Sequence, residues 1–181
     1  AIMAVDMAGF SRMMSADEIG TVVLLRALWG EVLHPAVARH GGRVVKMMGD
    51  GALVEFISVV DAVECSAGIQ RAMIDRNHKA AQPVALRIGV NLSEIIVDGE
   101  DILGDGVNIA ARLEQLNKKY GTYILATDAT VRAAAGDFRV RRVDELAVRG
   151  RVAPTVMPLM VRNAWSPTVR IRTVRSLALL R

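Results

Sequence analysis

The stretch VVKMMGDGALVEF, residues 44–56, constrains the fold of this chain more than any other feature. Two apolar runs flank Gly-Asp-Gly, a pattern typical of two antiparallel strands joined by a tight turn. Lys46 and Asp50 are charged residues in the middle of this largely apolar hairpin. Asp50 could simply be a solvated residue of the turn. Other segments of the sequence must indicate whether it has a functional role as well.

The segments around the hairpin predict a β-α-β-β-α-β order. Strands are predicted at 1–6, 43–48, 52–56 and 85–92. The first helix follows a capping box, Ser15 to Glu18, and apolar residues recur at helical spacing up to Leu33. Gly41 and Gly42 end it. The second helix opens at Ser58 and Asp61 and ends near Asn77, with Ala62, Cys65, Ile69 and Met73 on one apolar face.

The second half of the chain predicts a smaller α/β extension. We expect a strand at 94–99 paired with 85–92, a helix at 105–119, a strand at 122–127 and a helix at 128–136. Segments 137–143 and 154–161 are expected to close the sheet. The predicted fold class is α+β, a ferredoxin-like βαββαβ core with this extension. Residues 1–163 would form one domain, and 164–181 a basic linker or tail.

Charge is distributed unevenly along the 181 residues. The formal net charge is +4, but no acidic residue follows Glu145. The first 145 residues carry 16 basic and 19 acidic side chains, a net of −3. A mildly acidic body argues against a broad nucleic-acid-binding face. The tail could contact a membrane surface or another domain, or it could be a solvated linker. The basic residues after Glu145 are Arg149, Arg151, Arg162, Arg170, Arg172, Arg175 and Arg181.

Composition also bears on the cell compartment. No uninterrupted apolar run approaches the roughly 20 residues of a membrane-spanning helix. The single cysteine, Cys65, excludes an intrachain disulfide and fits a reducing cytoplasm. Because the sequence starts at Ala1 without an initiator Met, a membrane anchor or regulatory domain in a longer protein stays open.

Two separated aspartates are expected to meet in this topology. Asp6 ends the first strand, and Asp50 lies in the turn of the neighbouring hairpin. Two carboxylates brought together repel each other unless a cation lies between them. Oxygen ligands of this kind suit Mg²⁺ or Mn²⁺, which commonly bring substrate phosphates with them. This arrangement favours two-metal phosphoryl chemistry.

Four segments carry a specific resemblance: VDMAGFS, HGGRVVKMMGDGALVEF, LRIGVN and DILGDGVNIAARLE. With them, the chain resembles a class III nucleotidyl cyclase catalytic domain over about residues 1–160, and is most similar to bacterial adenylate cyclases. The resemblance implies two divalent cations at Asp6 and Asp50. It also implies a homodimer in which each active site takes residues from both subunits.

The resemblance assigns further roles residue by residue. Asn108 would orient the ribose, and Arg112 would stabilise the transition state. Lys46 and Asp101 would read the purine. Arg149 stands where the family usually has a triphosphate-binding lysine, and its fork geometry differs from that of lysine. The turn whose amides would hold the triphosphate comprises Met7, Gly9, Phe10 and Ser11.

The chemistry of the base favours ATP over GTP. Adenine N1 accepts a hydrogen bond and its N6 amino group donates one, so a lysine and a carboxylate complement them. Guanine presents the opposite pattern and would leave Lys46 and Asp101 mismatched.

Three of these residues also have simpler alternative roles, which the surrounding motifs make the less favoured ones. Lys46 could be a strand lysine whose amine reaches solvent, and Asn108 and Arg112 could belong to an exposed polar helix face. At the level of function, the rivals are a guanylate cyclase and a catalytically silent cyclase-like module that binds nucleotide or dimerises. The expected activity is an adenylate cyclase that converts ATP to cyclic AMP and pyrophosphate.

Overall fold

The structure is a computed structural model that describes residues 1–94, 96–99, 101–135, 138–141, 143–145 and 155–160. The first half contains β1 (Ile2–Met7), α1 (Phe10–Ala16), α2 (Glu18–Leu28), the π-helix η1 (Trp29–Leu33), α3 (His34–Arg39), β2 (Arg43–Met48), β3 (Gly51–Glu55) and α4 (Val59–Asn77). The second half contains β4 (Leu86–Asn91), β5 (Ile96–Asp98), β6 (Asp101–Leu103), α5 (Asp105–Tyr120), β7 (Ile124–Thr127), α6 (Asp128–Ala134), β8 (Arg139–Val140), β9 (Asp144–Glu145) and β10 (Thr155–Met160).

The main sheet has the strand order β2-β3-β1-β4-β7-β10-β8, and β9 pairs with β10. β1 lies between β3 and β4 and is antiparallel to both. The order β2-β3-β1-β4 is that of a ferredoxin-like core, so the predicted fold class is confirmed. β7 continues the sheet parallel to β4, and β10 and β8 close it as the sequence predicted.

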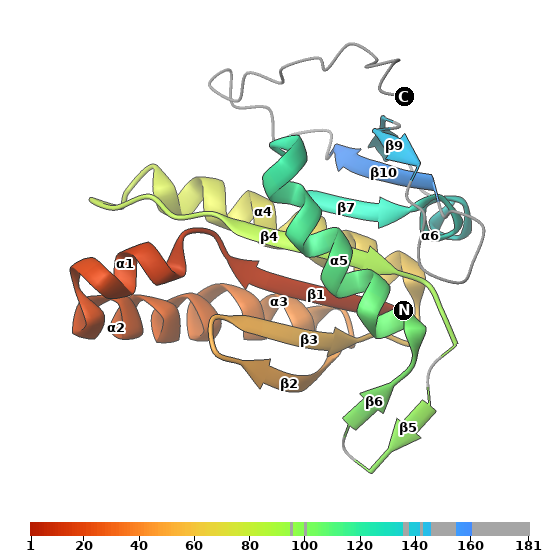
Figure 1. Cartoon of the computed structure of the whole chain (residues 1–181), viewed down its shortest axis with the longest axis horizontal. Helices are drawn as coiled ribbons and strands as arrows, with labels where there is room; N and C mark the ends of the chain where they lie inside the picture. The colour runs from red at the N-terminus through yellow and green to blue at the C-terminus, as the bar shows by residue number, and fades with distance from the viewer. Residues whose placement is uncertain (95, 100, 136–137, 142, 146–154, 161–181) are drawn as a thin grey trace, which may run out of the picture.

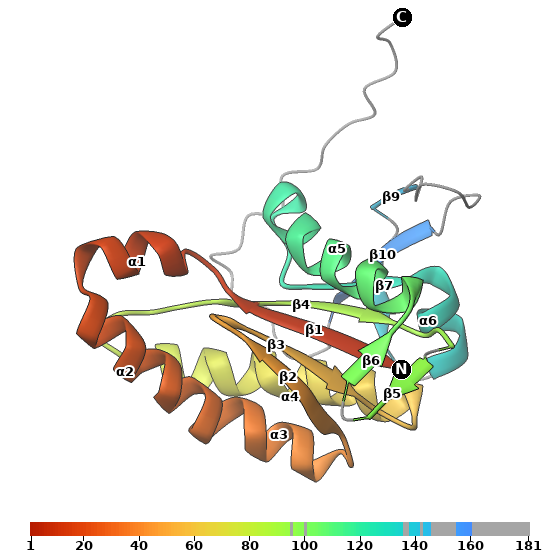
Figure 2. The same cartoon turned by 60° about the horizontal axis from the view of Figure 1, so that its bottom comes forward.

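Helices cover the two faces of this sheet unequally (Figures 1 and 2). The helices from α2 to α4 lie on one face, and α5 crosses the other. The strands follow period 2: Met3, Val5 and Met7 of β1 belong to the larger core under α2–α4, whereas Ile2 and Ala4 belong to a smaller core with Ala110 of α5. Asp6 shares the parity of Ile2 and Ala4, so β1 directs it towards the α5 face.

The first helical segment differs from the prediction. Ser15 lies inside α1, where its hydroxyl donates to the Ser11 carbonyl at 3.0 Å. The cap of α2 is Asp17, whose carboxylate accepts from the Gly20 amide at 2.9 Å. The capping-box prediction was therefore wrong by two residues, because an aspartate in an extended conformation competes well for this position.

The helix from Glu18 to Arg39 is continuous and, within the described residues, is the one long and apolar enough to span a membrane. Its inner side packs on the sheet, and Leu25, Leu28 and Leu33 are buried in the larger core. This packing accounts for those apolar residues, whereas Ile19 and Val23 of the same helix are exposed.

The predicted pairing of residues 94–99 with β4 was also wrong. β5 instead pairs with β6 in a separate two-stranded sheet. Both edges of β4 are already taken, one by β1 and the other by β7. The β5–β6 hairpin lies beside β2 at the end of the β2–β3 hairpin away from its turn (Figures 1 and 2).

Candidate active site

The structure brings Asp6 and Asp50 together. Asp6 pairs in register with Gly51, and the Met7 amide donates to the Asp50 carbonyl at 3.2 Å. The pKa of the Asp50 carboxyl is raised, first by burial and then by the negative charge of Asp6. A carboxylate whose proton affinity is raised by a neighbouring carboxylate is suited to share a cation with that neighbour.

Sequence reasoning missed Arg87, which faces Asp6 across the β1–β4 ladder. Its Nη2 lies 2.5 Å from Asp6 Oδ2, and its Nε lies 2.9 Å from Glu114 Oε1. The second pair is a close charge contact without hydrogen-bond alignment. The alternation of LRIGVN gave a signal: Leu86, Ile88 and Val90 belong to the larger core, so Arg87 had to face α5.

Glu114, the second missed residue, lies on the buried side of α5 with Ala110, Leu113 and Asn117. Because glutamate is rarely buried without a partner, its place in this buried stripe was a signal in the sequence. Burial raises the pKa of the Glu114 carboxyl to about 7, with Asp6 and Asp50 adding to the rise and Arg87 opposing it. Among the described residues, Arg87 thus contacts the carboxylates of Asp6 and Glu114, and Asp50 lies beside Asp6.

Lys46 of β2 and Asp101 of β6, 55 residues apart in sequence, also meet. Lys46 Nζ lies 2.7 Å from Asp101 Oδ2, and the Ile102 amide donates to Oδ1 at 2.9 Å. The hydrogen bond from Lys46, followed by that from Ile102, lowers the pKa of the Asp101 carboxyl. Because both side chains are about half exposed, they can be reached by a ligand.

Asn108 and Arg112 lie one turn apart on α5, as predicted, and neither is buried. They occupy the opposite side of the helix from Ala110 and Glu114, which pack against the sheet. Within one chain, the structure therefore separates Asn108 and Arg112 from the Asp6–Asp50 pair.

The turn after β1 is built around Gly9, whose φ of +83° is a left-handed conformation that glycine adopts readily. Phe10 is half-buried and Ser11 is exposed. Their amides lie in the first turn of α1, where helical geometry provides no acceptor. The Met7 amide already donates to the Asp50 carbonyl. In this respect it differs from the Phe10 and Ser11 amides, to which the helix offers no acceptor. Arg149 lies outside the described residues.

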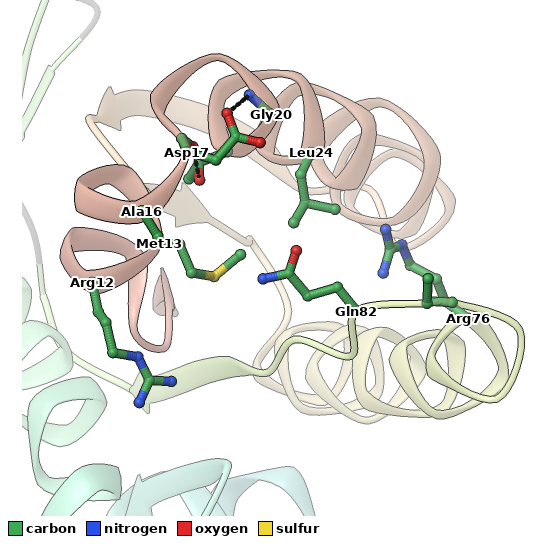
Figure 3. A pocket seen from close by; sticks show the side chains of 11 residues that line it. Arg12, Met13, Ala16, Asp17, Gly20, Leu24, Arg76 and Gln82 are labelled. Carbon is green, nitrogen blue, oxygen red and sulfur yellow. Dashed lines mark hydrogen bonds between the residues drawn. The ribbon is translucent and has the colours of Figure 1, made fainter.

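Two other features lie apart from this cluster. A cavity of about 550 Å³ opens between α1, α2 and the segment after α4 (Figure 3). Separately, the ligand atoms of His40, Asp61 and Glu64 lie within 4.8 Å of one another where α3 meets α4. Neither contains an aspartate of the candidate site. The cavity is lined by Arg12, Met13, Ala16, Asp17, Gly20, Thr21, Leu24, Arg76, Ala80, Ala81 and Gln82.

Comparison with known proteins agrees with this geometry. Residues 1–161 match the family described as "Adenylate and Guanylate cyclase catalytic domain". The chain belongs to this family. The "Putative adenylate cyclase 3" of Rhizobium meliloti is 51% identical over 126 residues, which are 68% of this chain and 22% of that protein. Members of this cyclase family form cyclic nucleotides from nucleoside triphosphates and generally use divalent metal ions.

Solved structures share the cyclase fold. An adenylate/guanylate cyclase/hydrolase from Silicibacter pomeroyi is 31% identical with a TM-score of 0.74, and the match covers 90% of this chain and 96% of that one. The guanylyl cyclase Cya2 is 25% identical with a TM-score of 0.73, and the match covers 87% and 89%. Because these neighbours include a guanylyl cyclase, the fold does not determine the base. The chain spans about a quarter or less of the length of the curated relatives first matched.

Proposed function

We propose that this cyclase domain is an adenylate cyclase, which converts ATP to 3′,5′-cyclic AMP and pyrophosphate. The observation that carries the choice of ATP is the 2.7 Å contact between Lys46 and Asp101. It sets a cationic donor beside a carboxylate acceptor, which match the adjacent acceptor N1 and donor N6 of adenine. The lysine and the aspartate would exchange their mutual bond for the adenine edge when ATP binds.

The cluster at Asp6 fits two divalent cations, Mg²⁺ or Mn²⁺. Among the described residues, Asp6, Asp50 and Glu114 supply three carboxylates and Arg87 one guanidinium, which leaves a partly buried excess of negative charge. Carboxylate oxygens are the donors that these hard cations prefer. Asp6 and Asp50 would hold the cations. When bound, the cations would lower the pKa of the ribose 3′-hydroxyl and neutralise triphosphate charge.

The remaining residues would orient the substrate and stabilise charge. The first-turn amides after Gly9, at Phe10 and Ser11, would donate to the triphosphate. Asn108 would hold the ribose so that its 3′-oxygen lies in line with the α-phosphorus. The Arg112 guanidinium would stabilise the negative charge that develops on the phosphoryl oxygens. Arg149 would contact the leaving pyrophosphate.

We further propose a homodimer with shared active sites. Asn108 and Arg112 lie on the side of α5 away from the sheet that carries Asp6, so a second subunit is needed to bring the two sets together. Exposed apolar side chains near Lys46 and Asp101 support a contact surface there. They belong to β2, β5 and β6: Met47, Met48, Ile96 and Leu103.

The setting of the domain is also a proposal. Because the chain matches only a fraction of the length of its curated relatives, we propose that it is part of a longer protein with a regulatory or membrane-anchored part. We propose that the domain works in the cytoplasm, where ATP is available. ATP and a second copy of the chain would be its partners.

Purified protein assayed separately with ATP and with GTP, each with Mn²⁺, tests the base choice. Cyclic AMP formed at a kcat/KM at least roughly tenfold above that for cyclic GTP is expected. Preference for GTP would identify a guanylate cyclase, and the absence of both products would identify a silent cyclase-like module. Either result would overturn the adenylate cyclase proposal.

A further inference from the structure

Glu114 is fixed directly over strand β4. Gly89 lets α5 approach so closely that a Cβ added there would lie 2.1 Å from the Ala110 carbonyl oxygen and 2.5 Å from the Glu114 amide nitrogen. One turn later, the Asn117 side chain donates to the Ile88 carbonyl at 2.9 Å. The backbone around Glu114 is therefore tied to β4 on both sides, and its carboxylate has a set position beside Arg87.

The two carboxylate oxygens of Asp6 have different neighbours. Oδ2 accepts from Arg87 Nη2, which comes from β4. Oδ1 lies on the other side, 3.7 Å from the position that a Cβ would take at Gly51, next to Asp50. Arg87 thus occupies one oxygen, and the other is directed towards the hairpin where the cations are proposed to bind.

Arg87 needs a second anion beside it if it is to hold one oxygen of Asp6 without lowering the affinity of the site for cations. Its side chain is 18% exposed, so little water screens its charge, and an uncompensated guanidinium next to Asp6 would repel a divalent cation. Glu114 places its carboxylate 2.9 Å from Nε, whereas Asp6 is bound at Nη2. The glutamate both balances the charge of Arg87 and restrains its orientation.

We propose that Glu114 is a positioning residue that acts through Arg87 to orient the Asp6 carboxylate and preserve its affinity for divalent cations. This inference rests on the proposed function, because it takes Asp6 and Asp50 as the metal ligands. Outer partners of metal ligands typically change metal affinity by roughly 10–100-fold. A glutamate that served only the stability of α5 would leave metal affinity unchanged in folded protein.

The test measures Mn²⁺ binding directly by electron paramagnetic resonance, with 3′-deoxy-ATP, which lacks the attacking hydroxyl, and a protein-free blank. Glu114→Gln is compared with wild type, with Arg87→Gln and with the double variant. Glu31→Gln, an exposed glutamate of η1, is the matched control. We expect Glu114→Gln to weaken Mn²⁺ binding roughly tenfold or more, no loss in Glu31→Gln, and less than about twofold further loss when Glu114→Gln is added to Arg87→Gln.

Each outcome decides one question. Wild-type affinity in folded Glu114→Gln, or an additive loss in the double variant, overturns the positioning role. If wild type and Asp50→Ala bind Mn²⁺ equally, the proposed metal site itself fails, which is a separate result. Should Glu114→Gln not fold, Arg87→Lys replaces it. The lysine keeps the charge but has one nitrogen in place of the separate Nε and Nη2 that contact Glu114 and Asp6, so the same roughly tenfold loss is expected. Undiminished binding by folded Arg87→Lys would equally refute the role.

Discussion

Gly89 is the position where the smallest change should have the largest effect on this domain. An alanine methyl there would meet the Ala110 carbonyl oxygen at 2.1 Å and the Glu114 amide nitrogen at 2.5 Å, both of them backbone atoms of α5. Contacts shorter than 3.0 Å are not tolerated, so α5 must move outwards by about 1 Å. Overpacking of this kind typically costs about 1–3 kcal/mol.

The expected effect of Gly89→Ala on stability can be measured by thermal unfolding. For a domain of this size, each kcal/mol lowers Tm by roughly 2–4 °C. Activity should fall further than stability predicts, because α5 carries Asn108, Arg112 and Glu114, and a shift of about 1 Å at catalytic groups can cost roughly 100-fold.

Gly30→Ala is the matched control for this experiment. An added Cβ at Gly30 would have no neighbour within 4 Å, so the same substitution should stabilise the helix by about 0.5–1 kcal/mol. If Gly89→Ala retained wild-type Tm and activity, the close packing of α5 on β4 and its role in placing the site residues would both be refuted.

Three further predictions concern single features. Asp50→Ala should abolish turnover and leave the circular dichroism spectrum unchanged; near-normal turnover in saturating Mn²⁺ would contradict the assignment of Asp50 as a metal ligand. Lys46→Glu combined with Asp101→Cys should reduce ATP turnover and relax discrimination against GTP, and an unchanged ATP/GTP ratio of kcat/KM would place base selection elsewhere. Burial raises the pKa of the Cys65 thiol from 9.0 to about 12, so above pH 9 the unfolded chain releases a proton that the folded chain retains. Between pH 9 and 12 the free energy of unfolding of wild type should therefore fall relative to that of Cys65→Ala, by at most about 1.4 kcal/mol per pH unit; parallel pH curves would show that the thiol ionises normally in the folded protein.

The sequence predicted those parts of the site that lie next to distinctive turns. Asp50 follows from Gly-Asp-Gly, and its meeting with Asp6 follows from the βαββαβ order. The Lys46–Asp101 pair came from the family resemblance, since nothing in the spacing of residues 46 and 101 indicates a contact. Hydrophobic periodicity also located the long helices and the central strands.

Other features depend on tertiary packing that local patterns do not encode. Arg87 was missed although the alternation in β4 was a signal for the face it occupies, and its contact with Glu114 also requires the position of α5 along the strand, which Gly89 permits. The pairing of β5 with β6 was missed because sequence does not reveal that both edges of β4 are occupied. The seven-residue α1 is too short for a periodic signal.

The central claim is that this chain makes cyclic AMP at active sites completed by a second copy of itself. Mixing purified Asp50→Ala and Arg112→Ala proteins, each inactive alone, tests it most directly. With free exchange of subunits, about half of the dimers are heterodimers, and each has one site with both lesions and one with neither, so about a quarter of wild-type activity should return. No recovery, although native mass spectrometry shows heterodimers, would contradict the shared-site account.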